Sequence, residues 1–183
     1  AQMTVGDLSK GRIWFISQLL VGSAVMEKAP FETGVSLGSF TPPKETDATI
    51  EAAIREYGAD PLRWYLVSLG PFWRRRAIRP EGVRQSYRIL NTFHNASHYV
   101  ASQCAQRSIE PPPLTESAKE RMHVMDIWFA SKLERMKAAC AKAYTDDAPW
   151  DALQALRQFI CFDLSRLYLP WAKRRLRGGT DLE

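Results

Sequence analysis

Residues 54–95 read IREYGADPLRWYLVSLGPFWRRRAIRPEGVRQSYRILNTFHN, and this stretch decides how the chain folds. The pattern predicts a helix that ends at Gly58, because glycine readily takes the left-handed conformation that closes a helix. Asp60 followed by Pro61 predicts the start of a second helix, since proline fits the first helical turn. That short helix is expected to stop at Gly70.

A cluster of arginines follows in the same stretch. Arg74–Arg76 and Arg79 lie in a predicted loop directly after Trp73. A long helix is then predicted from Pro80 to about Cys104. Apolar residues at a helical period predict that its buried positions are 83, 87, 90, 93, 94, 97 and 100.

Further helices are predicted on both sides of this stretch. They cover residues 12–28, 116–144 and 150–176, with a proline-rich spacer at 109–115 and a brief strand within 31–40. The first is apolar on most faces and is expected to be buried. The last is expected to begin with Asp147 as its N-cap and to kink at Pro170. The sequence therefore predicts a mainly α protein whose C-terminal two-thirds form an up-and-down helical bundle.

The net charge is +5, and the positive charge is concentrated in one part of the chain. Between Phe72 and Arg107 there are seven arginines and a single acidic residue, Glu81. Such a local excess is compatible with a polyanionic partner, although the total charge does not require one. Three sparse cysteines and no apolar run of about 20 residues predict a reducing compartment and no membrane partner. The cytoplasm is expected, with the mitochondrial matrix as the alternative.

No self-sufficient active site is evident in the sequence. The three histidines, at positions 94, 98 and 123, lie inside predicted helices. His94 and His98 are four residues apart, but two histidines without a third ligand are a weak metal signal, so core or groove-lining roles are favoured. A glycine-rich phosphate loop and paired catalytic carboxylates are not evident either. The sequence predicts no catalytic residue, no cofactor and no metal site.

Composition leaves two interpretations of the basic residues open. They form solvated basic faces, with the cluster near the C-terminus favoured by the helix dipole, or they contact phosphates while an aromatic ring or a histidine stacks on an unpaired base. In the second interpretation the RNA-binding residues are Trp73, Arg74, Arg75, Arg76, Arg79, Arg84, Arg88, His94, Asn95, Lys173, Arg174, Arg175 and Arg177.

A family resemblance favours the second interpretation. The motifs appear in the order Tyr57-Gly58-Ala59-Asp60, Leu62-Arg63-Trp64-Tyr65, Trp73 and Glu81-Gly82-Val83. This order resembles the junction between the catalytic and anticodon-binding domains of class I aminoacyl-tRNA synthetases, in the isoleucine/valine/leucine group and closest to its isoleucyl members. The segments 11–35, 125–136 and 155–176 are similar to neighbouring parts of the same family.

The resemblance implies a domain organisation and a loss of catalysis. It makes residues 1–70 a remnant of a Rossmann-like α/β catalytic domain with connecting helices, and residues 71–183 an anticodon-binding-like helical bundle. The family activates an amino acid with ATP through a histidine-rich signature, which this chain lacks, and a lysine-rich loop. Only Ser36-Leu37-Gly38 resemble the tail of that loop, without its lysines.

The favoured function is a non-catalytic, synthetase-derived module that binds a tRNA anticodon stem-loop or other structured RNA. One alternative is the C-terminal part or subunit of an isoleucyl-tRNA synthetase that acts with a separate catalytic part. Another is a protein-docking subunit of an RNA–protein assembly such as an organellar ribosome. Residues 12–40 are expected to bind a protein partner or to self-associate, because the apolar helix there would be left partly uncovered.

Overall fold

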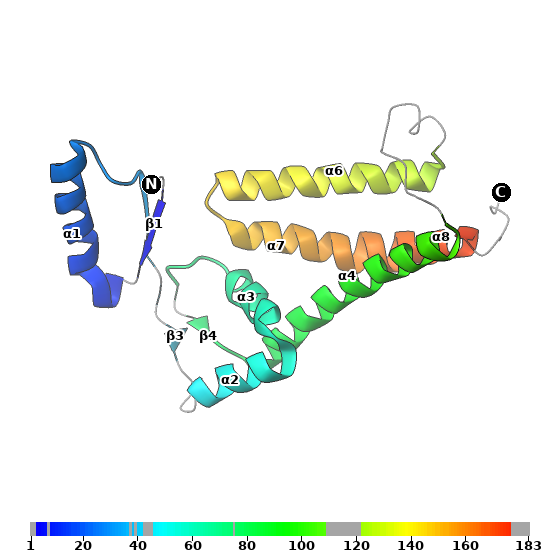
Figure 1. The fold of residues 1–183 in the computed structure, drawn as a ribbon, viewed down its shortest axis with the longest axis horizontal. Coiled ribbons are helices and arrows are strands. Elements are labelled where there is room, and N and C mark those ends of the chain that lie inside the picture. Colours follow the sequence, from blue (N-terminus) through cyan, green and yellow to red (C-terminus); the bar gives the residue numbers. More distant parts are fainter. Residues whose placement is uncertain are drawn as a thin grey trace.

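Helices dominate the described part of this chain (Figure 1). The structure is a computed structural model, and it describes residues 3–6, 8–36, 38, 40–41, 46–74, 76–108 and 122–176. A helical body and a separate N-terminal β–α–β unit lie next to each other.

Three long helical segments form the body. They are α4 (Pro80–Gln106), α6 (Val124–Thr145) and a last segment composed of α7 (Pro149–Gln158), η1 (Phe159–Tyr168) and α8 (Leu169–Leu176). Helix α6 lies along α7, and α4 crosses obliquely to contact η1 (Figure 1). The predicted helical bundle is confirmed.

The start of α6 differs from the prediction. Residues 109–121, with the proline-rich spacer and the predicted helix start, lie outside the described residues, and α6 begins at Val124. His123 is its N-cap: Nδ1 of His123 accepts a hydrogen bond of 3.2 Å from the backbone N–H of Met125. The Asp126 carboxylate accepts one of 3.2 Å from the backbone N–H of His123. The prediction that His123 lies inside a helix is wrong, because its ring nitrogen replaces the usual capping oxygen.

The turn from α6 to α7 also corrects a prediction. Ala148, not Asp147, is the N-cap of α7. Asp147 has a φ of 52°, and Asp146 is the C-cap of α6. A tight reversal between two antiparallel helices needs a left-handed residue, which aspartate tolerates better than most residues. Asp147 is therefore used for its backbone conformation rather than for capping.

The last helical segment is irregular before its proline. The backbone takes π-helical form over Phe159–Tyr168, and α8 begins at Leu169, one residue before Pro170. A kink was expected at Pro170 itself. Since proline lacks the N–H that an α-helix needs and crowds the preceding turn, the widened turns lie on its N-terminal side.

Two buried clusters hold the body together. The first joins the short helices to the start of α4 and consists of Ala53, Leu62, Tyr65, Ile78 and Val83. The second joins α4 to η1 through Ile89, Phe159 and Ile160, with Phe129 and Leu133 of α6 packed against it. Both clusters depend on burying apolar surface across helix contacts. The first one contains residues from both sides of the predicted domain boundary at residues 70 and 71, which remains a prediction.

The buried face of α4 is rotated from the predicted one. Val83, Ser86, Ile89 and Ala96 are buried, whereas Tyr87, Phe93 and Val100 are half-exposed. His94 and Ser97 are exposed as well. The prediction assumes that a single apolar face is buried along the whole helix. The structure packs the helices α2 (Thr46–Tyr57) and α3 (Ala59–Ser68) against the first half of α4 and η1 farther on, so the covered face is set by different neighbours along its length.

The short helices follow the sequence pattern closely. Helix α2 (Thr46–Tyr57) ends at Gly58, which has a φ of 88° and donates its backbone N–H to the Ile54 carbonyl at 2.9 Å. Helix α3 (Ala59–Ser68) begins one residue before Asp60, with Gly58 as its N-cap and no side-chain cap. Asp60 instead sits in the first turn, where its charge suits the helix dipole.

The N-terminal unit is a parallel β–α–β arrangement. Strand β1 (Met3–Gly6) pairs in parallel with β2 (Thr33–Ser36), with Val5 opposite Val35, and α1 (Leu8–Met26) connects them. Strand β1 was not predicted. The predicted burial of this helix is wrong: Ile13, Leu20 and Val25 are 80%, 66% and 77% exposed. No other element in the described ranges covers these side chains, and no described helix is long and apolar enough to cross a membrane.

Candidate nucleic-acid interface

Residues 71–79, here called the arginine connector, link α3 to α4, and Tyr65 fastens the C-terminal end of this segment. The Tyr65 hydroxyl donates a hydrogen bond of 3.2 Å to the Ala77 carbonyl and accepts one of 3.1 Å from the backbone N–H of Arg79. Tyr65 is buried in α3. Because a buried hydroxyl needs hydrogen-bond partners, the connector backbone is fastened to the body at this point.

Gly82 makes the close approach of Tyr65 possible. A Cβ atom at position 82 would lie 2.1 Å from Cε2 of Tyr65, far inside van der Waals contact. Only glycine therefore fits here, so the glycine of the Glu81-Gly82-Val83 motif has a packing reason. The tyrosine ring then reaches past α4 to the connector.

An aromatic cluster fastens the other end of the connector. The rings of Phe72 and Trp73 both meet the indole of Trp150 edge-to-face, at centroid distances of 5.5 Å and 5.7 Å. Trp73 nevertheless stays 59% exposed. Sequence reasoning found Trp73 but missed Trp150, because no local pattern shows that the start of α7 reaches this loop.

The connector also contacts described residues that follow the N-terminal unit, namely Gly38, Phe40 and Thr41. The backbone N–H of Gly38 donates a hydrogen bond of 2.5 Å to the Phe72 carbonyl. Strand β3 (Phe40–Thr41) pairs in parallel with β4 (Arg76–Ala77). The predicted loop thus contains a short strand, and its backbone is ordered on two sides.

Exposed arginines extend from the connector along the first half of α4. Arg74, Arg79, Arg84 and Arg88 are all exposed and form no ion pair with a described residue. Some other exposed cations are paired, as in Arg63–Asp60 at 3.0 Å. Arg84 and Arg88 lie near Tyr57. The pKa of Tyr57 is raised, chiefly by a hydrogen bond with Glu56, and the positive charges of these two arginines partly oppose that rise. A row of unpaired cations is suited to contact with phosphates.

The remaining predicted residues on α4 continue the polar surface. Asn95 is exposed, and so are His94 and His98, whose ring centroids are 6.4 Å apart. The two histidines therefore do not lie in the core, which corrects that part of the expectation. Among the described residues, no group of three or more His, Cys, Asp or Glu side chains could hold a metal ion.

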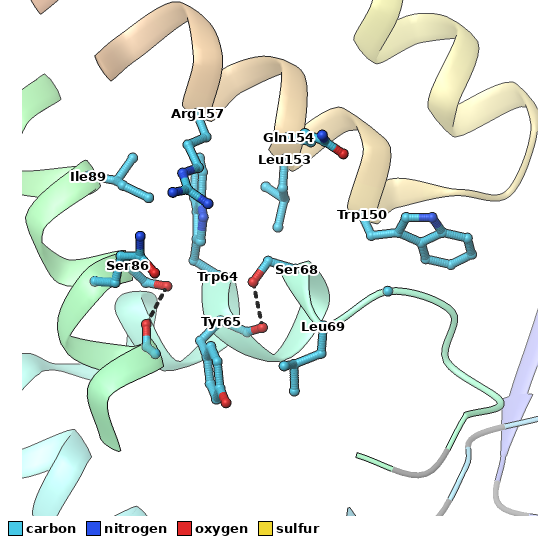
Figure 2. A pocket seen from close by; sticks show the side chains of 13 residues that line it. Trp64, Tyr65, Ser68, Leu69, Ser86, Ile89, Trp150, Leu153, Gln154 and Arg157 are labelled. Atoms are coloured by element: carbon cyan, nitrogen blue, oxygen red, sulfur yellow. Dashed lines mark hydrogen bonds between the residues drawn. The ribbon is translucent and has the colours of Figure 1, made fainter. Parts of the chain in front are cut away.

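A cavity of about 320 Å³ opens between α3, α4 and α7, beside this surface (Figure 2). Its walls combine two tryptophans, three aliphatic side chains and several uncharged polar groups with one cation, and none of its lining residues is acidic. The lining includes Trp64, Gln85, Trp150, Gln154 and Arg157. Figure 2 shows the Arg157 side chain descending from α7 toward Trp64 on α3. Arg157 is exposed and makes no ion pair with a described residue.

The basic cluster near the C-terminus lies at the other end of α4. Lys173 sits 4.5 Å from the ring centroid of Tyr99, which is 19 residues beyond Pro80 and so roughly 28 Å along the helix. Arg175 pairs with Asp126 at 2.9 Å and covers the Trp171 ring at 4.7 Å. These two cations fasten α8 to its neighbours, and the structure does not join them to the connector.

Four predicted residues add little to this picture. Arg174 is exposed in the last turn of α8. Arg75 and Arg177 lie outside the described residues, and Arg76 is described through its backbone in β4. Their RNA-binding roles remain predictions.

Asp126 is a structural hub rather than a site residue. Its carboxylate accepts hydrogen bonds from the Tyr168 hydroxyl and from the Arg175 guanidinium, each at 2.9 Å, in addition to capping α6. Burial and the hydrogen bond to Asp126 raise the pKa of Tyr168 to about 12. The aspartate of the MDIW motif thus joins α6, η1 and α8.

The sequence of this chain is similar to those of known tRNA ligases. The chain is 29% identical to an isoleucine–tRNA ligase of Methanopyrus kandleri over 97% of its length. It is 30% identical to that of Methanocella arvoryzae over 99% of its length. Its sequence relatives are isoleucine–tRNA ligases. The chain spans 17% of the length of each of these ligases, so it corresponds to a piece of a synthetase.

The resemblance to the isoleucyl members of the class I synthetases is confirmed by these ligases. A solved leucyl-tRNA synthetase of Agrobacterium radiobacter K84, in a ternary complex with tRNA and LeuAMS, aligns with 100% of this chain and 27% of its own. The identity is 15% and the TM-score is 0.46. No protein-family model matches the chain.

Proposed function

We propose that this chain is a synthetase-derived module that binds structured RNA, with a tRNA anticodon stem-loop as its ligand. The observation that carries the proposal is the row of exposed arginines that form no ion pair with a described residue, on a connector whose backbone is fastened on two sides. The phosphate backbone supplies most of the affinity of such complexes, and ordered cations lose less conformational entropy on binding. The similarity to isoleucine–tRNA ligases supports tRNA as the RNA.

The cavity gives this interface a place for an unpaired base. Unpaired bases are recognised by stacking on aromatic or guanidinium planes and by hydrogen bonds to their edges. Trp64 and Arg157 offer such planes, and the Gln154 amide offers both a donor and an acceptor. In this arrangement Arg74, Arg79, Arg84 and Arg88 hold the phosphates while one loop base enters between α3 and α7.

The module does not activate an amino acid by itself in this proposal. The segment that resembles the ATP-site loop holds Ser36-Leu37-Gly38 without the lysines that would stabilise the transferring phosphates. Pyrophosphate exchange with each aliphatic amino acid tests this on purified protein. Exchange above the enzyme-free blank contradicts the proposal, and exchange that appears only on adding a separate catalytic part favours the alternative of a split synthetase.

The RNA interface is tested by titrating a tRNA anticodon stem-loop at three salt concentrations. The triple variant Arg74→Ala/Arg79→Ala/Arg84→Ala should bind more weakly. Its slope of log K against log salt should be smaller by about 0.7 to 0.9 for each lost phosphate contact, which is roughly 2 to 3 in total. The control Arg63→Ala/Lys137→Ala/Lys142→Ala removes the same charge from exposed ion pairs elsewhere. Equal slopes for both triple variants would reduce the arginines to surface charge.

The exposed helix α1 supports a second candidate function, docking to a protein. Residues 13–26 contain no charged side chain, and most of their large apolar groups are exposed. A contiguous apolar surface of this kind usually marks an interface. The protein-docking subunit therefore stays as the competing proposal, and it predicts that a protein rather than RNA is recovered with the chain from native extract.

A further inference from the structure

Two different parts of the chain contact the arginine connector: the helical body and the segment that follows the N-terminal unit. Tyr65 and Trp150 come from the helical body and fasten its ends. Gly38 and β3 come from the segment that follows the N-terminal unit; Gly38 bonds to Phe72, and β3 pairs with Arg76 and Ala77. The conformation of the connector that carries the arginines therefore depends on a part of the chain outside the bundle.

Gly38 makes this contact possible by close approach of two backbones. A Cβ atom at position 38 would lie 2.4 Å from the Arg74 carbonyl oxygen and 2.7 Å from that of Trp73. These obstacles are backbone atoms, which cannot rotate away as a long side chain would. Any residue other than glycine must push the two segments apart, and this would lengthen the hydrogen bond between the Gly38 N–H and the Phe72 carbonyl.

The short β3–β4 ladder extends the same contact toward the arginines. Phe40 lies opposite Arg76 and Thr41 opposite Ala77 in parallel register. Two residue pairs are too few for an independent sheet, so the ladder depends on the backbones already being adjacent. Ala77 is also the residue whose carbonyl accepts from Tyr65. Gly38, β3 and Tyr65 therefore act together on one backbone segment.

We propose that Gly38 is a positioning residue for RNA binding: it lets the N-terminal unit hold the arginine connector in its binding shape. This inference rests on the proposed RNA-binding function. The N-terminal unit would then control RNA affinity without touching RNA, because an ordered connector loses less conformational entropy when phosphates bind. A partner that displaced the N-terminal unit would loosen the connector and weaken RNA binding.

Hydrogen–deuterium exchange on the full chain tests whether the contact at Gly38 stabilises the connector backbone. Gly38→Ala should speed exchange of connector amides by about five- to tenfold, the effect of losing roughly one hydrogen bond, and leave α6 and α7 unchanged. Gly34→Ala is the matched control, because a Cβ atom there would meet Phe15 at an ordinary 3.5 Å. Connector exchange that is identical in Gly38→Ala, Gly34→Ala and wild type would overturn the proposal.

A second variant reaches the same contact by another route. Phe40→Pro/Thr41→Pro removes both β3 backbone N–H groups, so the ladder is weakened whichever of them donates. Faster connector exchange with an unchanged urea midpoint for the bundle supports the inference. If the connector exchanges at the wild-type rate although β3 has lost both donors, the inference fails.

RNA titration then separates this inference from the proposed function. Gly38→Ala should weaken stem-loop binding about three- to tenfold, whereas Gly34→Ala should bind like wild type. Unchanged affinity in a variant with a loosened connector overturns the positioning role. Failure of the wild-type chain to bind RNA at all overturns the proposed function and the positioning role together, while the exchange result still decides the hold.

Discussion

The hydroxyl oxygen of Tyr65 accepts a hydrogen bond of 3.1 Å from the backbone N–H of Arg79, the N-cap residue of α4. A side chain from α3 thus fixes where the connector ends and where the longest helix begins. The same hydroxyl donates to the Ala77 carbonyl, so one atom organises both ends of a three-residue segment.

Removing this hydroxyl should destabilise the fold. Tyr65→Phe loses both hydrogen bonds and leaves the two backbone groups to water, at a cost of about 1 to 2 kcal/mol in the free energy of unfolding. Urea unfolding followed by tryptophan fluorescence measures the loss. Tyr87→Phe, at a half-exposed position on α4, is the control and should leave the midpoint unchanged. Equal midpoints for both variants would show that the Tyr65 bonds add nothing.

Gly82→Ala should be destabilising because the new methyl group would overlap the Tyr65 ring. Overpacking of this kind costs about 1 to 3 kcal/mol, against a small gain in helix propensity. In a Tyr65→Leu background the same substitution should cost much less, since the obstructing ring is gone. A double-mutant cycle measures this coupling, and additive effects would contradict the proposed contact.

The pH dependence of stability should report on Tyr168. Its pKa is raised from 10.0 to about 12, so the folded state keeps a proton that the unfolded state loses over this range. The stabilisation is therefore complete below pH 10 and is lost as the pH rises toward 12. Tyr168→Phe should flatten the fall in the free energy of unfolding between pH 10 and pH 12. If the free energy of unfolding of the variant falls as steeply with pH as that of wild type, a group other than Tyr168 causes the fall.

A base in the cavity should sense Arg157. With 2-aminopurine placed singly at each position of the stem-loop, one position should show quenching by the indole of Trp64 on binding. Arg157→Ala should weaken binding of that RNA by about 1 to 2 kcal/mol and leave binding of the abasic version at that position unchanged. Arg166→Ala is the control, since Arg166 covers the Phe162 ring instead. If Arg157→Ala weakens binding of the intact and the abasic RNA equally, the base does not occupy the cavity.

Self-association should depend on α1. The triple variant Ile13→Lys/Leu20→Lys/Val25→Lys should lower the sedimentation-average mass at high concentration if this helix is an interface. Val124→Lys/Ile127→Lys changes exposed apolar residues on α6 and should have no such effect. A wild-type chain that remains monomeric throughout, with no protein partner recovered from extract, would leave α1 without a docking role.

Local signals in the sequence predicted the helices well. Gly58 and Pro80 act through their own backbone conformations, so the ends of α2 and the start of α4 could be placed in advance. The contacts between distant segments could not. Tyr65 meets Ala77, and Trp150 meets Trp73, only because of how helices pack, and no periodicity encodes such pairs.

The errors have a common physical cause. The burial of α1 was inferred from its apolar composition, but burial requires a neighbour, and the described residues supply none. The RNA-binding role of Lys173 and Arg175, which form a second basic cluster near the C-terminus, was inferred from their charge and remains a prediction. In the structure they have aromatic and acidic partners at the other end of α4.

The edge-to-face pair of Trp73 and Trp150 gives the molecule an optical signature. Because the centroids of the two indoles are 5.7 Å apart, we expect their electronic transitions to couple and to give a paired positive and negative band in circular dichroism. One ring belongs to the connector and the other to α7, so the band intensity follows the geometry between them. The native chain thus contains its own spectroscopic reporter for the shape of this loop, without any added dye.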